Sequence, residues 1–416
     1  MKLIIHRGSR EIGGSCVEVS TASTRIILDV GLPLEALGSR AAGRLGKRTD
    51  DRISAVFRKT PAVDAVLLSH AHADHTGLLN LAPPGLPIYC SEGTGMMMRA
   101  GAVYAAQIDL PRGRQRELKQ RQPERIGDIT VTAHPVDHSA FDSLALEIEA
   151  DGKRLLYSGD LRLHGRKPGM ARALIQSLSG KPVNALLMEG THFSGSRESG
   201  PTEKALEETI HADIKSAPGL VLACFSPMHV DRLVTFYKAT IRTGRHFVVD
   251  HYAGFVFHLV SKIAKIPKPR KSAGIRVFLP KFQKRILKVE RCFANSRIML
   301  DEVLARPDKY LMLFRPSMIS SDFSRGLPER VRCIYSYWSG YLAKEDWQLV
   351  RAKVAQAQGD LIERHTSGHI FADDIVRFAK AIKPQFVIPI HTSRPQEFKS
   401  LFPNTLLLAD GECLQI

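Results

Sequence analysis

The first 190 residues alternate short apolar runs with turn residues, a pattern that predicts a strand-rich body. Apolar runs of about four to seven residues between turn signals are typical of buried β-strands. Helical patterns are fewer: one lies over 94–106, and another, just beyond this part of the chain, follows a Pro201-Thr202 start signal. We expect strands over residues 1–7, 25–29, 65–68, 129–132, 144–148, 154–158 and 185–188, and helices over 94–106 and 203–214.

The pattern changes after Gly190. Longer helical patterns occupy the middle of the chain, for example over 231–243 and 344–357, and strand-like runs return at 385–390 and 405–408. A chain of 416 residues is long for one domain and sufficient for two. The sequence therefore predicts a division into three segments, which are 1–190, 191–360 and 361–416.

Side chains that bind metals gather where one predicted strand ends. The segment His70-Ala71-His72-Ala73-Asp74-His75 directly follows the apolar run at 65–69. Burying imidazoles and carboxylates costs free energy unless they are paired or bound to a metal ion. We interpret this segment as a metal site at the carboxyl end of a strand.

Four further segments repeat this arrangement along the chain. Each places a ligand-type side chain after an apolar run or ahead of a predicted helix: Asp137-His138-Ser139, Ser158-Gly159-Asp160, Thr366-Ser367-Gly368-His369 at a predicted helix start, and Pro389-Ile390-His391. In α/β sheets the carboxyl ends of the strands meet at one edge, which is the usual place for chemistry. We therefore expect these side chains to converge.

In this order the motifs resemble those of the metallo-β-lactamase superfamily, and within it those of the β-CASP nucleases, in particular ribonuclease J-like enzymes. Residues 8–15 resemble the family's opening hairpin, Asp29-Val30-Gly31 its supporting aspartate motif, and residues 70–75 its HxHxDH motif. The later motifs are matched, in chain order, by His138, Asp160, Glu189, His369 and His391.

This resemblance implies an α/β fold. It implies a four-layer αββα metallo-β-lactamase domain formed by residues 1–190 and 361–416, with an inserted α/β β-CASP domain over 191–360. It also implies two Zn²⁺ ions, with Mn²⁺ as an alternative because carboxylates take part. The implied ligands are His70, His72 and His138 for one ion, Asp74, His75 and His391 for the other, Asp160 as a bridge, and Asp29 as a group that orients a ligand.

The activity that the resemblance implies is hydrolysis of phosphodiester bonds in single-stranded RNA, leaving 5′-phosphate and 3′-hydroxyl ends. A metal-bridging hydroxide would attack phosphorus, because metal coordination lowers the pKa of water toward 7. Asp74 and Asp160 are implied catalytic residues of this metal centre. His369, supported by Glu189, is the candidate to protonate the leaving oxygen or bind a phosphate oxygen. The candidates for phosphate binding are Ser226, Ser367, Gly368 and His369.

Charge supports a polyanionic partner, since the formal net charge is +17. Basic residues concentrate between positions 262 and 291, against Glu290 alone: Lys262, Lys265, Lys268, Arg270, Lys271, Arg276, Lys281, Lys284, Arg285, Lys288 and Arg291. A phosphate-contacting surface and a solvated loop are the two interpretations of this stretch. The six cysteines form no CxxC pair and no apolar run approaches membrane-spanning length, so we expect a cytoplasmic protein with reduced thiols and no membrane partner.

The chain departs from the family in two places. Thr392-Ser393 replaces the Gly-Glu that often follows the motif C histidine, and the sequence ends at Ile416, where bacterial ribonuclease J carries a further domain. We leave the oligomeric state open, with a homodimer as one alternative.

Three other functions stay open beside the preferred RNA nuclease. A DNA nuclease of the β-CASP repair type uses the same chemistry, and nothing in the sequence reports on the 2′-hydroxyl. A small-molecule metallohydrolase is disfavoured by the separate His369 motif and the long insertion. A non-catalytic RNA-binding protein is disfavoured by the complete set of ligand-type residues.

Overall fold

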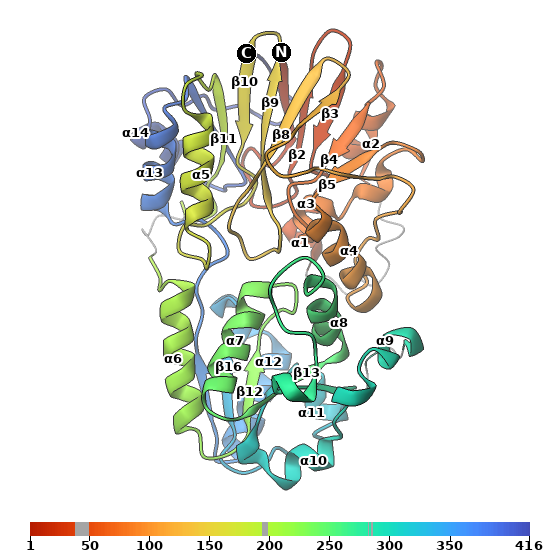
Figure 1. The fold of residues 1–416 in the computed structure, drawn as a ribbon. Helices are drawn as coiled ribbons and strands as arrows, with labels where there is room; N and C mark the ends of the chain where they lie inside the picture. The colour runs from red at the N-terminus through yellow and green to blue at the C-terminus, as the bar shows by residue number, and fades with distance from the viewer. Residues whose placement is uncertain (38–49, 194–198, 282, 284–285) are drawn as a thin grey trace. The chain divides into compact units, whose positions relative to one another are not determined.

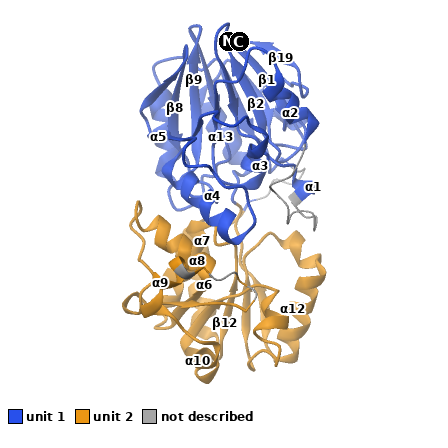
Figure 2. Cartoon of the chain, turned by 90° about the vertical axis from the view of Figure 1, so that its right-hand side faces the viewer, with its two compact units in different colours: residues 1–199, 368–416 blue, residues 200–367 orange. Residues whose placement is uncertain are grey.

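The computed structural model describes residues 1–37, 50–193, 199–281, 283 and 286–416 (Figure 1). The chain forms two compact units, Met1–Ser199 with Gly368–Ile416, and Gly200–Ser367 (Figure 2). These divisions lie slightly later in the chain than the predicted ones, because Thr191 still bonds within the first unit and Arg364 within the second. The predicted boundaries and the assignment of the inserted domain stay predictions.

The first unit contains a seven-stranded sheet with the order β19-β1-β2-β3-β4-β5-β6. Strands β1, β2 and β3 pair antiparallel, whereas β3, β4, β5 and β6 run parallel. The strands are β1 (Lys2–Arg7), β2 (Cys16–Ser20), β3 (Arg25–Leu28), β4 (Ala65–Leu67), β5 (Ile88–Cys90), β6 (Gln115–Glu117) and β19 (Cys413–Gln415).

The second sheet of this unit has six strands in the order β18-β11-β10-β9-β8-β7. Strands β18, β11 and β10 are parallel, and β10, β9, β8 and β7 pair antiparallel. The strands are β7 (Pro123–Ile126), β8 (Ile129–Pro135), β9 (Leu144–Ala150), β10 (Lys153–Tyr157), β11 (Ala185–Glu189) and β18 (Phe386–Ile390). Because β8, β10, β11 and β18 point the same way, their carboxyl ends share one edge.

The two sheets pack face to face around one apolar core, which draws side chains from both. In β9, Leu144 and Leu146 face this core while Ala145 faces a second apolar cluster on the outer side, as the alternation of side chains in a strand requires. That outer cluster is covered by helices α5 (Gly169–Leu178) and α13 (Ala372–Ile382). Helix α2 (Asp51–Arg58) lies beside the first sheet, and α3 (Ala73–Thr76) and α4 (Glu92–Tyr104) follow the carboxyl ends of β4 and β5 (Figure 1). The α/β class and the αββα arrangement implied by the resemblance are confirmed.

The predicted strands of the first half are present, with ends shifted by a residue or a few. The strand predicted over 405–408 is wrong, because only Thr405 forms a single bridge, to Val387. The apolar run there supplies packing instead, since Leu406 and Leu408 contact the core between the sheets. The remaining helices of this unit are α1 (Leu34–Leu37) and α14 (Gln396–Leu401).

The second unit is built on a six-stranded, fully parallel sheet with the order β14-β13-β15-β12-β16-β17. Its strands are β12 (Val221–Cys224), β13 (His246–Asp250), β14 (Ile275–Phe278), β15 (Tyr310–Leu313), β16 (Arg332–Tyr335) and β17 (Asp360–Glu363). Its helices are α6 (Glu203–Ser216), α7 (Val230–Arg242), α8 (His251–Val260), α9 (Leu287–Arg291), α10 (Leu300–Ala305), α11 (Met318–Ser321) and α12 (Glu345–Gln356). Among the described residues, no helix is both long and apolar enough to cross a membrane.

Candidate metal centre

The motif at residues 70–75 leaves the sheet at the end of β4 and turns into the short helix α3. The turn brings His70 Nε2 to 3.2 Å from His72 Nδ1, and α3 presents Asp74 and His75 one after the other. Gly31 makes this turn possible, because a Cβ at that position would lie 1.8 Å from the carbonyl oxygen of Asp74. The backbone of the supporting aspartate motif therefore packs directly against the histidine motif.

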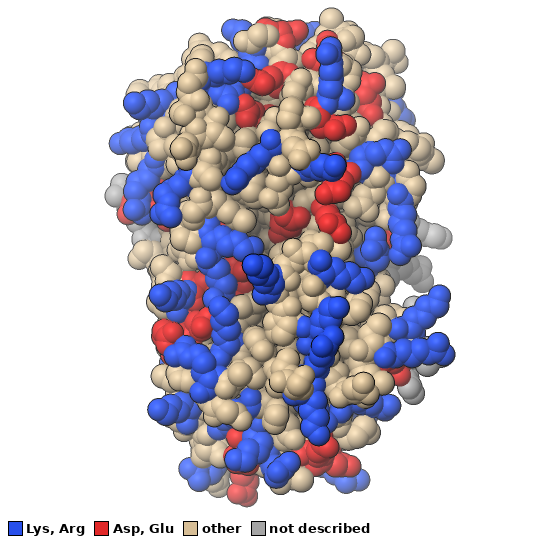
Figure 3. Space-filling view, in the orientation of Figure 1, with Lys and Arg blue, Asp and Glu red and all other residues tan. Residues whose placement is uncertain are grey.

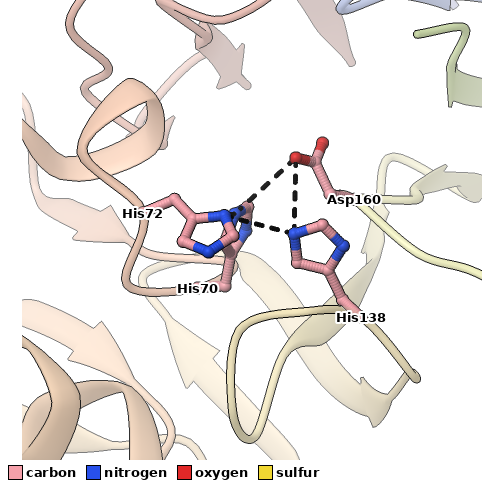
Figure 4. A group of neighbouring side chains, drawn as sticks. All are labelled: His70, His72, His138 and Asp160. Carbon is pink, nitrogen blue, oxygen red and sulfur yellow. Dashed lines mark hydrogen bonds and ion pairs between the residues drawn. The ribbon is translucent and has the colours of Figure 1, made fainter. Parts of the chain in front are cut away.

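Donor side chains from both sheets meet in three overlapping groups, and in each group the ligand atoms lie within 4.8 Å of one another. The groups are His70, His72, His138 and Asp160; Asp74, His75, Asp160 and His391; and Asp160, Glu189, His369 and His391. Figure 4 shows the first group, with three imidazoles turned toward one another and toward the Asp160 carboxylate. The expected convergence is thus seen for each metal-site residue proposed from the sequence.

Asp160 is common to all three groups. Its Oδ2 lies 3.2 Å from His75 Nε2 and 3.6 Å from His70 Nε2. The same oxygen lies 3.7 Å from His369 Nδ1, and 3.8 Å from the Nε2 atoms of His138 and His391. Both carboxylate oxygens are buried and accept no hydrogen bond from the described residues. A buried carboxylate is stabilised by nearby positive charge, and a carboxylate surrounded by imidazole nitrogens is a donor set that fits a divalent metal ion.

The histidines of the first group are held in the neutral form that binds metals. Burial, followed by the charge of His75, holds the pKa of His70 well below its usual range. Burial likewise lowers the pKa of His138, and it lowers the pKa of His72 to about 4. These imidazoles therefore offer lone pairs at neutral pH without first losing a proton.

The two aspartates are ionised. Burial acts to raise the pKa of Asp74, but the hydrogen bond from His391, 3.3 Å away, and nearby imidazoles hold it below the usual range. For Asp160, burial is again opposed by surrounding histidines, led by His391, and its pKa lies well below the ordinary value. The pKa of His75 behaves differently, because the carboxylates of Asp160 and Asp29 outweigh burial and raise it well above its usual range. The centre thus combines the neutral imidazoles of the first group with charged carboxylates.

Asp29 lies behind the cluster, fully buried and with a left-handed backbone, φ 57°. Its Oδ2 accepts hydrogen bonds from His75 Nδ1 at 2.8 Å, Ser69 Oγ at 2.7 Å and Tyr157 Oη at 2.7 Å. Its Oδ1 accepts the Ser69 backbone N–H at 2.7 Å. The bond to Nδ1 directs His75 Nε2 toward Asp160, which is the orienting role expected of Asp29. The sequence analysis missed Ser69 and Tyr157, although each adjoins a motif.

Buried Glu189 and half-buried His369 form a pair beside Asp160. Glu189 Oε2 lies 3.0 Å from His369 Nδ1, and its Oε1 accepts the backbone N–H of Leu161 at 2.9 Å. Burial disfavours a charge on His369, but the carboxylates of Glu189 and Asp160 outweigh burial and raise its pKa to about 9. This pair is the arrangement expected from the sequence for motifs A and B.

Thr191 is the main residue of the centre that the sequence analysis missed. Its Oγ1 donates to Glu189 Oε2 at 2.8 Å and lies 3.2 Å from His369 Nδ1 and 3.0 Å from His391 Nδ1. It therefore links the acid–histidine pair to the ring of His391, a residue with a left-handed backbone, φ 54°. The only signal in the sequence is its place two residues after Glu189.

The residues expected to bind phosphate are divided between the two units. The carbonyl of Gly368 accepts a 2.6 Å hydrogen bond from His138 Nδ1, and a Cβ there would lie 2.4 Å from Ser139 Oγ. The predicted helix start at 366–369 is wrong, because α13 begins at Ala372. Ser226, after β12, and Ser367 belong to the second unit, and their phosphate-binding roles stay predictions.

The basic stretch is exposed where the structure describes it. Exposed members are Lys262, Lys265, Lys268, Arg270, Lys271, Lys281, Lys288 and Arg291. Arg276 is instead engaged, 3.0 Å from Glu302, and Lys284 and Arg285 lie outside the described residues. In the view of Figure 3, basic side chains are spread over both units, with acidic side chains between them. The net positive charge is therefore distributed, and this stretch is one part of it.

Comparison with known proteins places these features in a family. The profile of a family described as "Beta-lactamase superfamily domain" matches residues 25–235. The chain is 27% identical to an RNase J-like protein of Methanocaldococcus jannaschii, over 58% of this chain and 56% of that protein. It is 25% identical to the transcription termination factor FttA of Methanothermobacter thermautotrophicus, over 57% of this chain and 39% of the factor. It is 23% identical to ribonuclease J of Sinorhizobium meliloti, over 85% of this chain and 63% of that enzyme.

These matches cover only part of each curated relative, since the chain spans between 39% and 63% of their lengths. A crystal structure of a protein of unknown function from Enterococcus faecalis V583 aligns over 99% of both chains, with a TM-score of 0.77 and 21% identity. That likeness concerns the fold alone. Together the matches confirm the resemblance that the motifs indicated.

Proposed function

This chain belongs to the β-lactamase superfamily, and we propose that it is a metal-dependent nuclease that hydrolyses phosphodiester bonds of single-stranded RNA. The observation that carries the proposal is the Asp160 carboxylate, which is buried, accepts no hydrogen bond from the residues that the structure describes, and is shared by three donor groups. One of these groups contains the Glu189–His369 pair, which offers a proton donor next to the metal ligands. Relatives named ribonuclease J support RNA as the substrate.

The donor set supports two divalent ions, and we propose Zn²⁺ with Mn²⁺ as the alternative. His70, His72 and His138 would hold one ion, Asp74, His75 and His391 the other, and Asp160 would contact both. Such ions, when bound, supply Lewis-acid activation of water and neutralise charge on the phosphate. Asp29 and Thr191 act from outside, because they fix the rings of His75 and His391.

The Glu189–His369 pair gives the reaction its acid. Glu189 holds His369 through Nδ1, so the other ring nitrogen, Nε2, points away from the carboxylate. We propose that His369 protonates the departing 3′ oxygen or hydrogen-bonds a phosphate oxygen, which leaves 5′-phosphate and 3′-hydroxyl ends. Leu161 and Thr191 keep Glu189 in position by donating to its two oxygens.

A DNA nuclease of the β-CASP repair type remains the alternative, since none of the contacts described above concerns a 2′-hydroxyl. A small-molecule metallohydrolase has less support, because it accounts neither for the Glu189–His369 pair nor for the second unit. We also propose a cytoplasmic location and, as one assembly, a homodimer.

The proposal is tested with end-labelled RNA and DNA of one sequence, each carrying a 5′-phosphate or a 5′-hydroxyl. We expect metal-dependent cleavage of RNA, loss of cleavage in Asp74→Ala, and normal cleavage in Asp301→Ala, which removes an exposed aspartate on α10. Cleavage that persists in purified Asp74→Ala would overturn the two-metal proposal. Cleavage of DNA alone would favour the repair-type alternative.

A second variant separates the acid from the metal ligands. We expect His369→Ala to reduce cleavage by about 10²- to 10⁴-fold, the range for a lost general acid. Its metal content, measured by elemental analysis, should stay close to that of the unchanged protein. An equal loss of metal and activity would make His369 a ligand and contradict its assignment as the acid.

A further inference from the structure

Trp338 is the most exposed large apolar side chain among the described residues, at 62%, and Tyr341 next to it is 43% exposed. The only other tryptophan, Trp347, is 6% exposed. An aromatic side chain left in water forgoes the free energy of burying its large apolar surface. Two exposed aromatic rings that lie together offer an apolar surface that another molecule could cover.

The backbone around Trp338 is fixed. Trp338 precedes the 3₁₀ turn Ser339–Ala343, which lies between β16 and α12 in the sequence. Its carbonyl accepts hydrogen bonds from Tyr335 Oη at 2.8 Å and from the N–H of Tyr341 at 3.1 Å. These bonds fix the main chain from which both aromatic side chains project.

The indole ring of Trp338 also packs at a defined position, against the backbone of Gly340. A Cβ at Gly340 would lie 2.3 Å from Cη2 and Cζ3 of Trp338, so only glycine allows the six-membered ring to lie this close to the backbone. The rings of Trp338 and Tyr341 meet edge to face, with centroids 5.4 Å apart and planes at 90°. The pair therefore forms a preorganised corner of two aromatic surfaces.

A cation adjoins this corner. Lys344 Nζ lies 4.5 Å from the centroid of the Tyr341 ring. Aromatic faces that stack on bases, combined with cations that contact phosphates, are what sequence-tolerant sites for single-stranded nucleic acid use. The lysine and the net charge of +17 favour an anionic ligand over an apolar protein surface.

The corner lies at the edge of the sheet where ligands bind in parallel α/β folds. β16, which precedes Trp338, pairs in parallel with β12 and β17, through Cys224↔Tyr335 and Tyr335↔Glu363. The segments that follow those two strands lead to Ser226 and Ser367, the residues expected to contact phosphate. The aromatic corner and both serines thus follow the carboxyl ends of neighbouring strands of one sheet.

We propose that Trp338 and Tyr341, with Lys344 beside them, bind an unpaired base of single-stranded RNA by stacking. The site would act as a substrate subsite of the second unit, so the inference rests on the proposed nuclease function. Because stacking requires a base whose face is accessible, the site selects single strands over duplexes. It does not distinguish RNA from DNA, since no 2′-hydroxyl is involved in stacking.

Tryptophan fluorescence reports on this site directly. In Trp347→Phe the signal comes from Trp338 alone, and Asp74→Ala in the same chain prevents cleavage during titration. We expect a 20-nucleotide oligoadenylate to quench the emission, and the same strand paired with oligouridylate to leave it nearly unchanged. Trp338→Ala should weaken binding of the single strand roughly 5- to 100-fold, and Trp338→Phe should weaken it less. Leu349→Ala removes another exposed apolar side chain, on α12, and should leave binding unchanged.

Several results would overturn the inference. These are binding by Trp338→Ala within twofold of the unchanged protein, equal quenching by duplex and single strand, or a change in sedimentation of Trp338→Ala without a change in RNA affinity. The last result would make the corner a protein contact. Circular dichroism checks that each variant is folded.

The cleavage assay separates this inference from the proposed function. We expect Trp338→Ala to raise KM for a long RNA while kcat, and the cleavage of a dinucleotide, stay unchanged. If the protein cleaves neither RNA nor DNA but single strands still quench Trp338, the proposed activity fails and the stacking site stands. If it cleaves RNA and Trp338→Ala behaves as the unchanged protein, the stacking site fails and the activity stands.

Discussion

Replacing Asp29 with asparagine tests whether the carboxylate behind His75 keeps the metal ligands in position. Asparagine has the same shape and tolerates the left-handed backbone at this position, so the change removes the charge with little strain. Four donors point at the two carboxylate oxygens: the N–H and hydroxyl of Ser69, His75 Nδ1 and Tyr157 Oη. An amide has one acceptor oxygen, and its NH₂ group accepts nothing.

The loss of folding stability in Asp29→Asn follows from these contacts. In its best orientation the amide oxygen replaces Oδ2 and keeps three donors, while the NH₂ group faces the Ser69 N–H, which lies 2.7 Å from Oδ1 in the unchanged protein. One hydrogen bond to a charged group is lost, and a buried donor is left without an acceptor, which together cost about 3–5 kcal/mol of stability. Because the ring of His75 is then less firmly held, metal affinity should fall about 10- to 100-fold.

Urea unfolding measures the first quantity, and titration against a chelator of known affinity measures the second. Tyr157→Phe is the matched control, because it removes one donor to Oδ2 and leaves the charge and the His75 bond in place. We expect the control to lose about 1.5 kcal/mol and to bind metal normally. Metal affinity in Asp29→Asn within twofold of the unchanged protein would refute the orienting role of Asp29.

Three further outcomes are expected. Thr191→Val, which removes a hydroxyl near two imidazoles, should lower kcat about tenfold with little change in melting temperature, and Thr191→Ser should restore it. Burial acts to raise the pKa of Glu18, but hydrogen bonds from His6 and Arg25 lower it from 4.5 to about 2. Its contribution to stability is therefore present above pH 4.5 and lost toward pH 2, so the deficit of Glu18→Gln in urea unfolding should disappear over that interval. Three basic residues follow α8: Lys268, Arg270 and Lys271. Neutralising them should reduce the slope of log K for RNA binding against log salt concentration by roughly 0.7 per charge that contacts phosphate. An unchanged slope would indicate that they belong to a solvated loop.

Particular elements show where the pattern of the sequence was informative. The strand at 144–148 was predicted because its apolar run is bounded by turn signals, and β9 occupies Leu144–Ala150. The sequence analysis missed helix α8, because most of its own residues are buried and its sequence therefore shows no amphipathic period. At 405–408 an apolar run that predicts a strand fills the core without joining the ladder.

The sequence by itself determined the kind of chemistry, because the residue types and the order of the motifs at strand ends already specify nitrogen and carboxylate donors in sufficient number for metal ions. Only the tertiary structure decided which of them share Asp160, and that Tyr157 and Thr191 complete the centre. The physical reason is that local periodicity reports whether a side chain is buried, whereas its hydrogen-bond partner depends on which distant strand lies opposite. The same holds for Trp338, whose exposure follows from the folded surface around it and not from its neighbours in the sequence.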